Sequence, residues 1–150
     1  MPPTGSGPAP VISASRFIIQ VHGLKVPFSE LSGINSEVEP VEYISADPTG
    51  KIIHTKQFGK TRPPKITLKR ALDTDTTIWA WHQLVLKGEP SAPTQCTLQL
   101  QDASGKTLLT YILDNAWPSK VDISGLKAGA TEIVMETVEI VCDSIMMDPG

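Results

Sequence analysis

Apolar and polar residues alternate along most of this chain, which is the pattern of strands that bury one face. In the first such stretch, residues 16–23, Phe17, Ile19 and Val21 share one phase. The same reasoning predicts about seven strands in all, at residues 16–23, 37–44, 66–72, 96–101, 107–113, 120–123 and 132–142. We therefore expect a mainly β (α+β) protein whose strands form a two-sheet β-sandwich or barrel.

One segment, at about residues 76–87, has helical spacing instead. Ile78, Trp81 and Val85 recur on one face of a 3.6-residue period. The Asp-Thr-Asp sequence at 73–75 can accept bonds from the free amides of a helix start, and Gly88 is a natural end. We expect one helix that flanks the sheets.

Trp117 is the other large aromatic residue that we place in the core between helix and sheet. The 13 prolines and 11 glycines indicate many turns between the strands. The expected organisation is a flexible Pro/Gly/Ser-rich arm at 1–15, one domain at 16–143 and a tail at 144–150. Within the domain we expect a turn-rich link at 27–33, an extended loop or loose hairpin arm at 46–65, and a break in the strand at 115–118.

Charge is segregated, although the net charge is only −3. Residues 51–70 hold seven basic residues and no acidic one, and residues 128–150 hold five acidic residues and no basic one. Two solvated faces explain this pattern. It also suits a surface that docks against the opposite surface of a neighbouring subunit, a heterologous contact that builds rings or filaments. On that hypothesis the contact residues are Tyr43, Lys56, Phe58, Lys60, Arg62, Lys65, Glu132, Glu136 and Glu139.

The sequence offers little chemistry. The three histidines have no cysteine or second histidine at ligand spacing, so we expect no metal, and no motif indicates a cofactor or a catalytic centre. Cys96 and Cys142 fall in apolar strand patterns and are expected to be buried free thiols. No apolar run is long enough for a membrane anchor. The basic segment contains one aromatic residue, which does not favour specific nucleic-acid binding.

An ordered set of short motifs carries a family resemblance. The set is Phe-Ser-Glu-Leu-Ser-Gly at 28–33, Glu-Tyr at 42–43, Gly-Lys at 59–60, Thr-Leu-Lys-Arg at 67–70, Trp-Ala-Trp at 79–81, Asn-Ala-Trp-Pro-Ser-Lys at 115–120, Glu-Ile at 132–133 and Glu-Ile at 139–140. Across about residues 16–142 the chain resembles the inner tube proteins of contractile phage tails and of the phage-tail-like contractile injection systems of bacteria.

The resemblance implies a structural protein without catalysis, in which ring-shaped hexamers stack into a hollow tube. Its implied partners are further copies of itself, a contractile sheath protein, baseplate or tube-initiator and terminator proteins, and payload in the lumen. It also implies assembly in the bacterial cytoplasm, as part of a phage tail or phage-tail-like particle that can be released. Two other functions fit the residues: a monomeric β-sandwich that binds carbohydrate or peptide, and a baseplate-proximal paralogue that initiates the tube.

Overall fold

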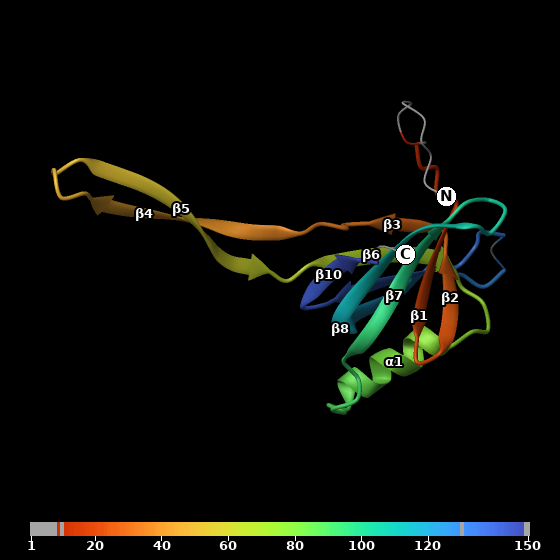
Figure 1. Ribbon diagram of the computed structural model, residues 1–150. Helices are drawn as coiled ribbons and strands as arrows, with labels where there is room; N and C mark the ends of the chain where they lie inside the picture. Colours follow the sequence, from red (N-terminus) through yellow and green to blue (C-terminus); the bar gives the residue numbers. More distant parts are fainter. Residues whose placement is uncertain (1–8, 10, 130, 149–150) are drawn as a thin grey trace.

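Ten strands and one helix make up the part of the chain described by the computed structural model, residues 9, 11–129 and 131–148 (Figure 1). They are β1 (Arg16–Val21), β2 (Leu24–Phe28), β3 (Glu30–Ser32), β4 (Glu37–Ala46), β5 (Ile52–Arg62), β6 (Lys65–Ala71), α1 (Thr77–Leu86), β7 (Thr94–Gln101), β8 (Thr107–Ser124), β9 (Met135–Val141) and β10 (Ser144–Met147). The mainly β architecture with one helix confirms the coarse prediction. Most of the expected N-terminal arm, and the end of the expected tail, lie outside the described residues.

Eight strands form one antiparallel sheet in the order β2-β1-β7-β8-β9-β6-β3, and β10 pairs with the free side of β8. The first half of β8 pairs with β7 and its second half with β9, so the sheet turns a corner along this strand. The two end strands, β2 and β3, do not pair with each other, and the expected closure into a barrel is therefore wrong for this subunit. β3 has only three residues, and they pair with β6.

A single core lies between the two halves of the sheet. Its fully buried side chains come from the inward phase of six strands and from the helix, namely Ile19, Val21, Val26, Ile66, Leu68, Ile78, Trp81, Leu98, Leu113, Val138 and Ile140. Apolar residues at every second strand position face this interior, which is why the alternation in the sequence predicts the strands. Burial of this apolar surface is the main force that holds the body together.

The corner in β8 corrects the prediction that residues 115–118 break the strand. Asn115 has a left-handed backbone, with φ of 51°. The pairing register shifts once between Leu113 and Ala116, on either side of Asn115, and once more between Pro118 and Lys120. These shifts are β-bulges, which bend a strand without ending it. Proline, which has no backbone N–H, is tolerated at such a position, and Pro118 is fully buried there.

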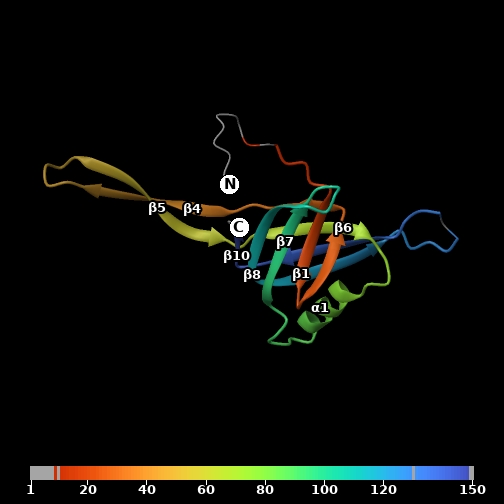
Figure 2. The ribbon, with the colours of Figure 1, turned by 45° about the vertical axis from the view of Figure 1, so that its right-hand side comes forward.

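The helix α1 closes one end of the core, mainly against β8 and partly against β2 (Figure 2). Trp81 is buried and donates from Nε1 to the carbonyl oxygen of Ala92 at 2.7 Å. At the C-terminal end, Glu89 N–H bonds to the Leu84 carbonyl and Gly88 N–H to the Val85 carbonyl. Gly88 has φ of +70°. This is the Schellman arrangement, in which glycine adopts the left-handed conformation that ends a helix.

Two further regions differ from the sequence-based prediction. The segment expected to be a turn-rich link holds the end of the short strand β2 and all of β3, and part of the expected tail forms β10. All three are short strands at the edges of the sheet or close to them. Short edge strands carry weak hydrophobic patterns because only part of each face is covered.

Candidate assembly interfaces

The hairpin of β4 and β5, residues 37–62, projects from the body and is called the arm here (Figures 1 and 2). Its two strands pair from Glu37 opposite Arg62 to Ala46 opposite Ile52. Among the described residues, the arm strands pair with each other and with no strand of the body. A two-stranded hairpin is at best marginally stable in water. Within the described residues, the arm therefore has no strand pairing to stabilise it beyond that between its own two strands.

The tip and the root of the arm are shaped by specific local features. At the tip, Asp47 Oδ1 accepts bonds from the Thr49 hydroxyl at 2.6 Å and from the amides of Thr49 and Lys51 at 2.9 Å. These bonds, the Thr49 hydroxyl first, hold the pKa of Asp47 below its ordinary value. Nearer the body a β-bulge interrupts the pairing of the two arm strands. Gly59 lies in this bulge, where the neighbouring backbone leaves no space for a side chain. A Cβ there would lie 2.6 Å from the Glu39 carbonyl oxygen.

Large apolar side chains are exposed along the arm. The exposed set is Val38, Val41, Tyr43, Ile44, Ile52, Ile53 and Phe58. Phe58 is 96% exposed and lies opposite Pro40 in the register. Clusters of exposed large apolar side chains on a soluble protein often mark an interaction site. Of the residues predicted as inter-subunit contacts, Tyr43 and Phe58 belong to this set.

The basic residues of the arm are only partly paired. Arg62 lies 3.7 Å from Glu37, and His54 Nδ1 lies 2.8 Å from Glu42, in both cases across the two arm strands. Lys56 faces Glu42 in the register. Within the described residues no ion pair forms on Lys60 or Lys56, and both side chains are exposed.

The acidic residues predicted as contacts divide into three situations. Glu132 is exposed in the loop before β9. Glu139 lies 3.6 Å from Lys65 of the adjacent strand, so these two predicted contact residues are paired within one subunit. Glu136 is buried and bonded to Arg70. The Glu136 side chain points into the core because it shares the strand phase of the buried Val138 and Ile140.

A buried ionic network organises the segment between β6 and α1. Arg70 Nε donates to Glu136 Oε1 at 2.9 Å, Nη1 donates to Asp73 Oδ1 at 2.8 Å, and Nη2 donates to the Asp75 carbonyl oxygen at 2.8 Å. Burial acts to lower the pKa of Arg70, but the bonds to Glu136 and Asp73 outweigh it and raise that pKa. The guanidinium fork matches several oxygens at once. Arg70 thereby ties the start of the helix to β9.

The two aspartates expected at the helix start lie before the N-cap residue, not at it. Asp75 Oδ1 accepts from the Thr77 amide at 3.0 Å and from its hydroxyl at 2.6 Å, while Thr76 occupies the N-cap position without a side-chain bond. Asp73 Oδ1 accepts from the Asp75 amide at 2.8 Å. That amide first, and Arg70 second, lower the pKa of Asp73.

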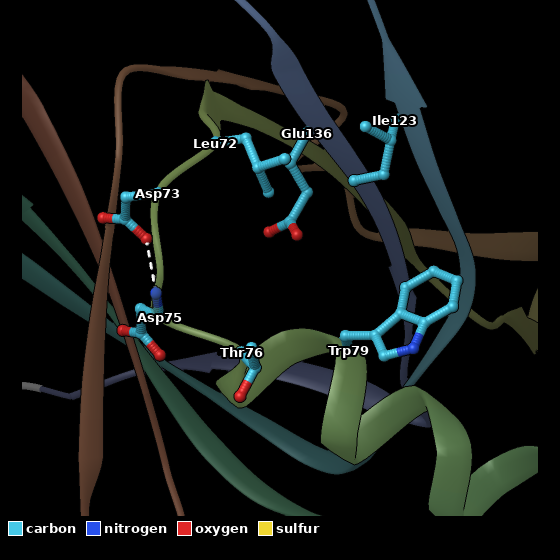
Figure 3. A pocket seen from close by; sticks show the side chains of 7 residues that line it. All are labelled: Leu72, Asp73, Asp75, Thr76, Trp79, Ile123 and Glu136. Carbon is cyan, nitrogen blue, oxygen red and sulfur yellow. Dashed lines mark hydrogen bonds between the residues drawn. The ribbon is translucent and has the colours of Figure 1, made fainter. Parts of the chain in front are cut away.

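A mostly apolar hollow of about 310 Å³ lies beside this network, and Figure 3 shows the side chains that line it. Leu72, Trp79 and Ile123 provide its apolar walls, and the carboxylate of Glu136 points into it. Trp79 is 42% exposed and Leu72 38% exposed. Trp79 stands apart from buried Trp81, as the helical geometry predicts. We call this cavity the α1 hollow.

The residues predicted for the core between helix and sheet lie at two depths. Ile78 and Trp81 are buried, whereas Val85 and Trp117 are half-buried. Val85 and Trp117 line a second, open hollow of about 230 Å³ at the C-terminal end of the helix. His82, between these positions, has Nδ1 2.9 Å from the Pro118 carbonyl oxygen, which joins the helix to the corner of β8.

Both cysteines are free and buried, as predicted. Burial is the main cause that raises the pKa of Cys96 to about 12 and that of Cys142 to about 11. Across the described residues there is no group of three or more His, Cys, Asp or Glu side chains placed to hold a metal ion. In the same part of the chain, no helix has the length and apolarity needed to cross a membrane.

The Arg70–Glu136 pair is the feature that sequence reasoning missed. The signal was present, because Arg70 follows Ile66 and Leu68 in their phase, and Glu136 precedes Val138 and Ile140 in theirs. Two opposite charges in the inward phases of two strands indicate a buried pair once the strands are known to be neighbours. The register places the two residues directly opposite each other.

Comparison with known families gives one match that spans most of the chain. The family described as T4-like virus tail tube protein gp19 matches residues 13–146. A comparison with curated protein sequences found no match.

Solved structures share the fold over nearly the full length. A chain in the extended sheath-tube complex of an extracellular contractile injection system, PVC, has a TM-score of 0.70 and 24% identity, with 95% of this chain and 93% of that chain covered. A chain in the tube-terminating cap of the anti-feeding prophage, AFP, has a TM-score of 0.70 and 21% identity, with both chains covered completely. A chain in the AFP baseplate has a TM-score of 0.69 and 16% identity, with 95% and 97% covered.

Proposed function

The chain belongs to the family of T4-like virus tail tube proteins, and from that premise we propose that its subunits form six-fold rings that stack head to tail into the hollow inner tube of a contractile particle. Membership makes it a structural, non-enzymatic component of a phage tail or tail-like particle. In the proposal, a sheath surrounds the tube and drives it into a target, and payload travels in the lumen. The particle is assembled in the bacterial cytoplasm, on a baseplate or initiator, and is closed by a terminator.

The observation that carries the proposal is the arm. It exposes seven large apolar side chains and lies apart from the body sheet. At the 3.3 Å rise per residue of a strand, its longer strand of 11 residues reaches roughly 36 Å. In the proposal, an arm of this length reaches from one subunit to the next. Burial of the exposed apolar residues against a neighbour supplies a driving force that the isolated subunit lacks.

Charge supports a defined orientation between subunits. Lys56, Lys60 and Arg62 lie on the arm, while exposed Glu132 and half-buried Glu139 lie on the body. In the proposal, the basic side chains of the arm, together with Lys65, meet acidic residues of a neighbour. Exposed ion pairs are each worth only about 0–1 kcal/mol, so they would set the register of stacking more than its strength.

The decisive experiment shortens the arm without opening the body. Val38 and Thr61 are partners in the register, so replacing residues 39–60 by Asn-Gly closes a short hairpin at that pair. Light scattering after size-exclusion chromatography and negative-stain microscopy should show rings and tubes for the wild-type chain. They should show folded subunits without long tubes for the shortened one. Wild-type chains that stay monomeric at every concentration would contradict the proposal and favour the monomeric binding module.

A charge test separates register from apolar burial. Reversing Lys60 and Arg62 together, to Glu, should prevent tube growth, because both positions then repel an acidic partner. Lys87 and Lys127, exposed on the body, offer a matched pair of control reversals. Normal tubes from the Lys60 and Arg62 double variant would refute the ionic part of the proposal.

A second candidate role is that of a subunit at the end of the tube. The same fold occurs, with full coverage of both chains, in the tube-terminating cap of AFP. A main tube protein should form tubes of many lengths when expressed alone, whereas an end subunit should stop at one or a few rings. The length distribution in the micrographs therefore separates the two roles.

A further inference from the structure

The α1 hollow is an apolar surface that no other part of the described chain fills. Leu72, Trp79 and Ile123 form its walls, and two of them, Leu72 and Trp79, are more than a third exposed. Apolar side chains that stay in water at a concave site gain free energy when another apolar group enters. An aromatic occupant suits this site best, because a ring beside Trp79 adds an edge-to-face or offset contact to simple burial.

The polar side of the same hollow selects for a positively charged partner. Asp73, Asp75 and Glu136 line it, and Arg70 is the one guanidinium in their network. Three carboxylates surround one cation, so two negative charges of this network stay uncompensated. The rigidity of the network fixes these oxygens in place before any partner arrives.

One exposed segment of the chain combines the two properties that the hollow requires. Phe58, almost fully exposed, is flanked at alternate positions of β5 by Lys56 and Lys60. Both views show the arm directed away from α1 of its own subunit (Figures 1 and 2). A contact between this segment and the α1 hollow must therefore join two copies of the chain.

We infer that Phe58 of one subunit's arm inserts into the α1 hollow of a neighbouring subunit, with Lys56 and Lys60 facing the carboxylates at its rim. The inference rests on the proposed assembly and adds to it the receiving site on the body. Phe58 then packs beside Trp79, and the buried Arg70 network serves as the fixed floor of an interface.

Cross-linking between two single variants tests the contact directly. Lys60→Cys places a thiol beside Phe58, and Thr76→Cys places one at the hollow, where the native hydroxyl makes no capping bond. The native Cys96 and Cys142 are buried, with raised pKa values, and stay unreactive toward a short bis-maleimide at neutral pH. The two variants are mixed, assembled and treated with the linker. The control mixture pairs Lys60→Cys with Lys87→Cys, an exposed position at the far end of the same helix.

The expected result is a covalent dimer in the Lys60→Cys and Thr76→Cys mixture, absent from each variant alone and from the control mixture. A mutational cycle gives a second readout. Phe58→Ala and Trp79→Ala should each raise the concentration needed for assembly by roughly tenfold or more, and the double variant should add little to either. Tubes that form normally without the cross-link, or with additive effects of the two alanines, overturn the inference and leave the proposed function standing. A wild-type chain that never assembles overturns both.

Discussion

Replacing Glu136 by methionine tests whether the Arg70 network stabilises the body. The side chains of Arg70 and Glu136 are 4% and 3% exposed, and Nε and Oε1 are 2.9 Å apart. Removing one partner of a buried pair leaves the other charge uncompensated, which typically costs 3–5 kcal/mol. Arg70 keeps Asp73 and the Asp75 carbonyl, so we expect the lower end, about 3 kcal/mol.

The assay is thermal and urea unfolding followed by circular dichroism, on the chain with the shortened arm so that assembly does not contribute. A loss of about 3 kcal/mol corresponds to a Tm lower by roughly 6–12 °C for a domain of this size. Glu139→Met is the matched control on the same strand, because its partner Lys65 is exposed and 3.6 Å away. That control should cost at most about 1 kcal/mol.

A double variant completes the test. With Arg70→Met added to Glu136→Met, no unpaired charge stays in the core, and a large part of the lost stability should return. If Glu136→Met costs no more than Glu139→Met, the buried pair contributes little and the reasoning is refuted. If the double variant is less stable than the single one by the full cost of a second mutation, the anchoring of Asp73 and Asp75 matters more than charge compensation.

Three further outcomes follow from the structure. Gly59→Ala should abolish tube formation, because a Cβ would lie 2.6 Å from the Glu39 carbonyl oxygen, and should leave the unfolding of the body unchanged. Negative-stain microscopy checks this, with nearby Gln57→Ala as the control that should assemble normally. The pKa of Asp47 is lowered, so the ionised carboxylate orders the arm tip at every pH above its ordinary pKa, and this order is lost as pH falls through the lowered pKa. In NMR spectra the amide signals of Thr49 and Lys51 should therefore shift in that acid range and not near neutrality. Cys96 and Cys142 should react with a thiol reagent at neutral pH only after denaturation, and rapid labelling of the native chain would show that the core opens.

The elements that sequence reasoning predicted well are those whose pattern depends on their own burial. The helix and the hairpin of β7 and β8 have strong periodicities, because one face of each meets the core. The Asn-Ala-Trp-Pro sequence misled the prediction, since proline near a strand usually marks its end, whereas here two bulges let β8 pass through the corner.

The position of the arm could not be predicted from the sequence, for a different reason. Its turn at Asp47 is evident from residue types, but the arm buries little within the subunit, so no hydrophobic pattern shows where it lies relative to the body. The separation of charge along the sequence suggests a docking surface, and that interpretation stays a prediction. Glu136 carried the same charge as Glu139 on the same strand, and only the strand register shows that it is directed toward Arg70.

The strand β8 also determines how this subunit carries mechanical load. Its 18 residues run without interruption through both halves of the sheet, paired with β7 and β10 in one half and with β9 in the other. Ladder hydrogen bonds lie perpendicular to the strands, so a pull along β8 shears many of them together instead of opening them one by one. A force applied to one half thus reaches the other through a continuous backbone. We expect a subunit built in this way to resist stretching along that direction, because both halves of the sheet share the load.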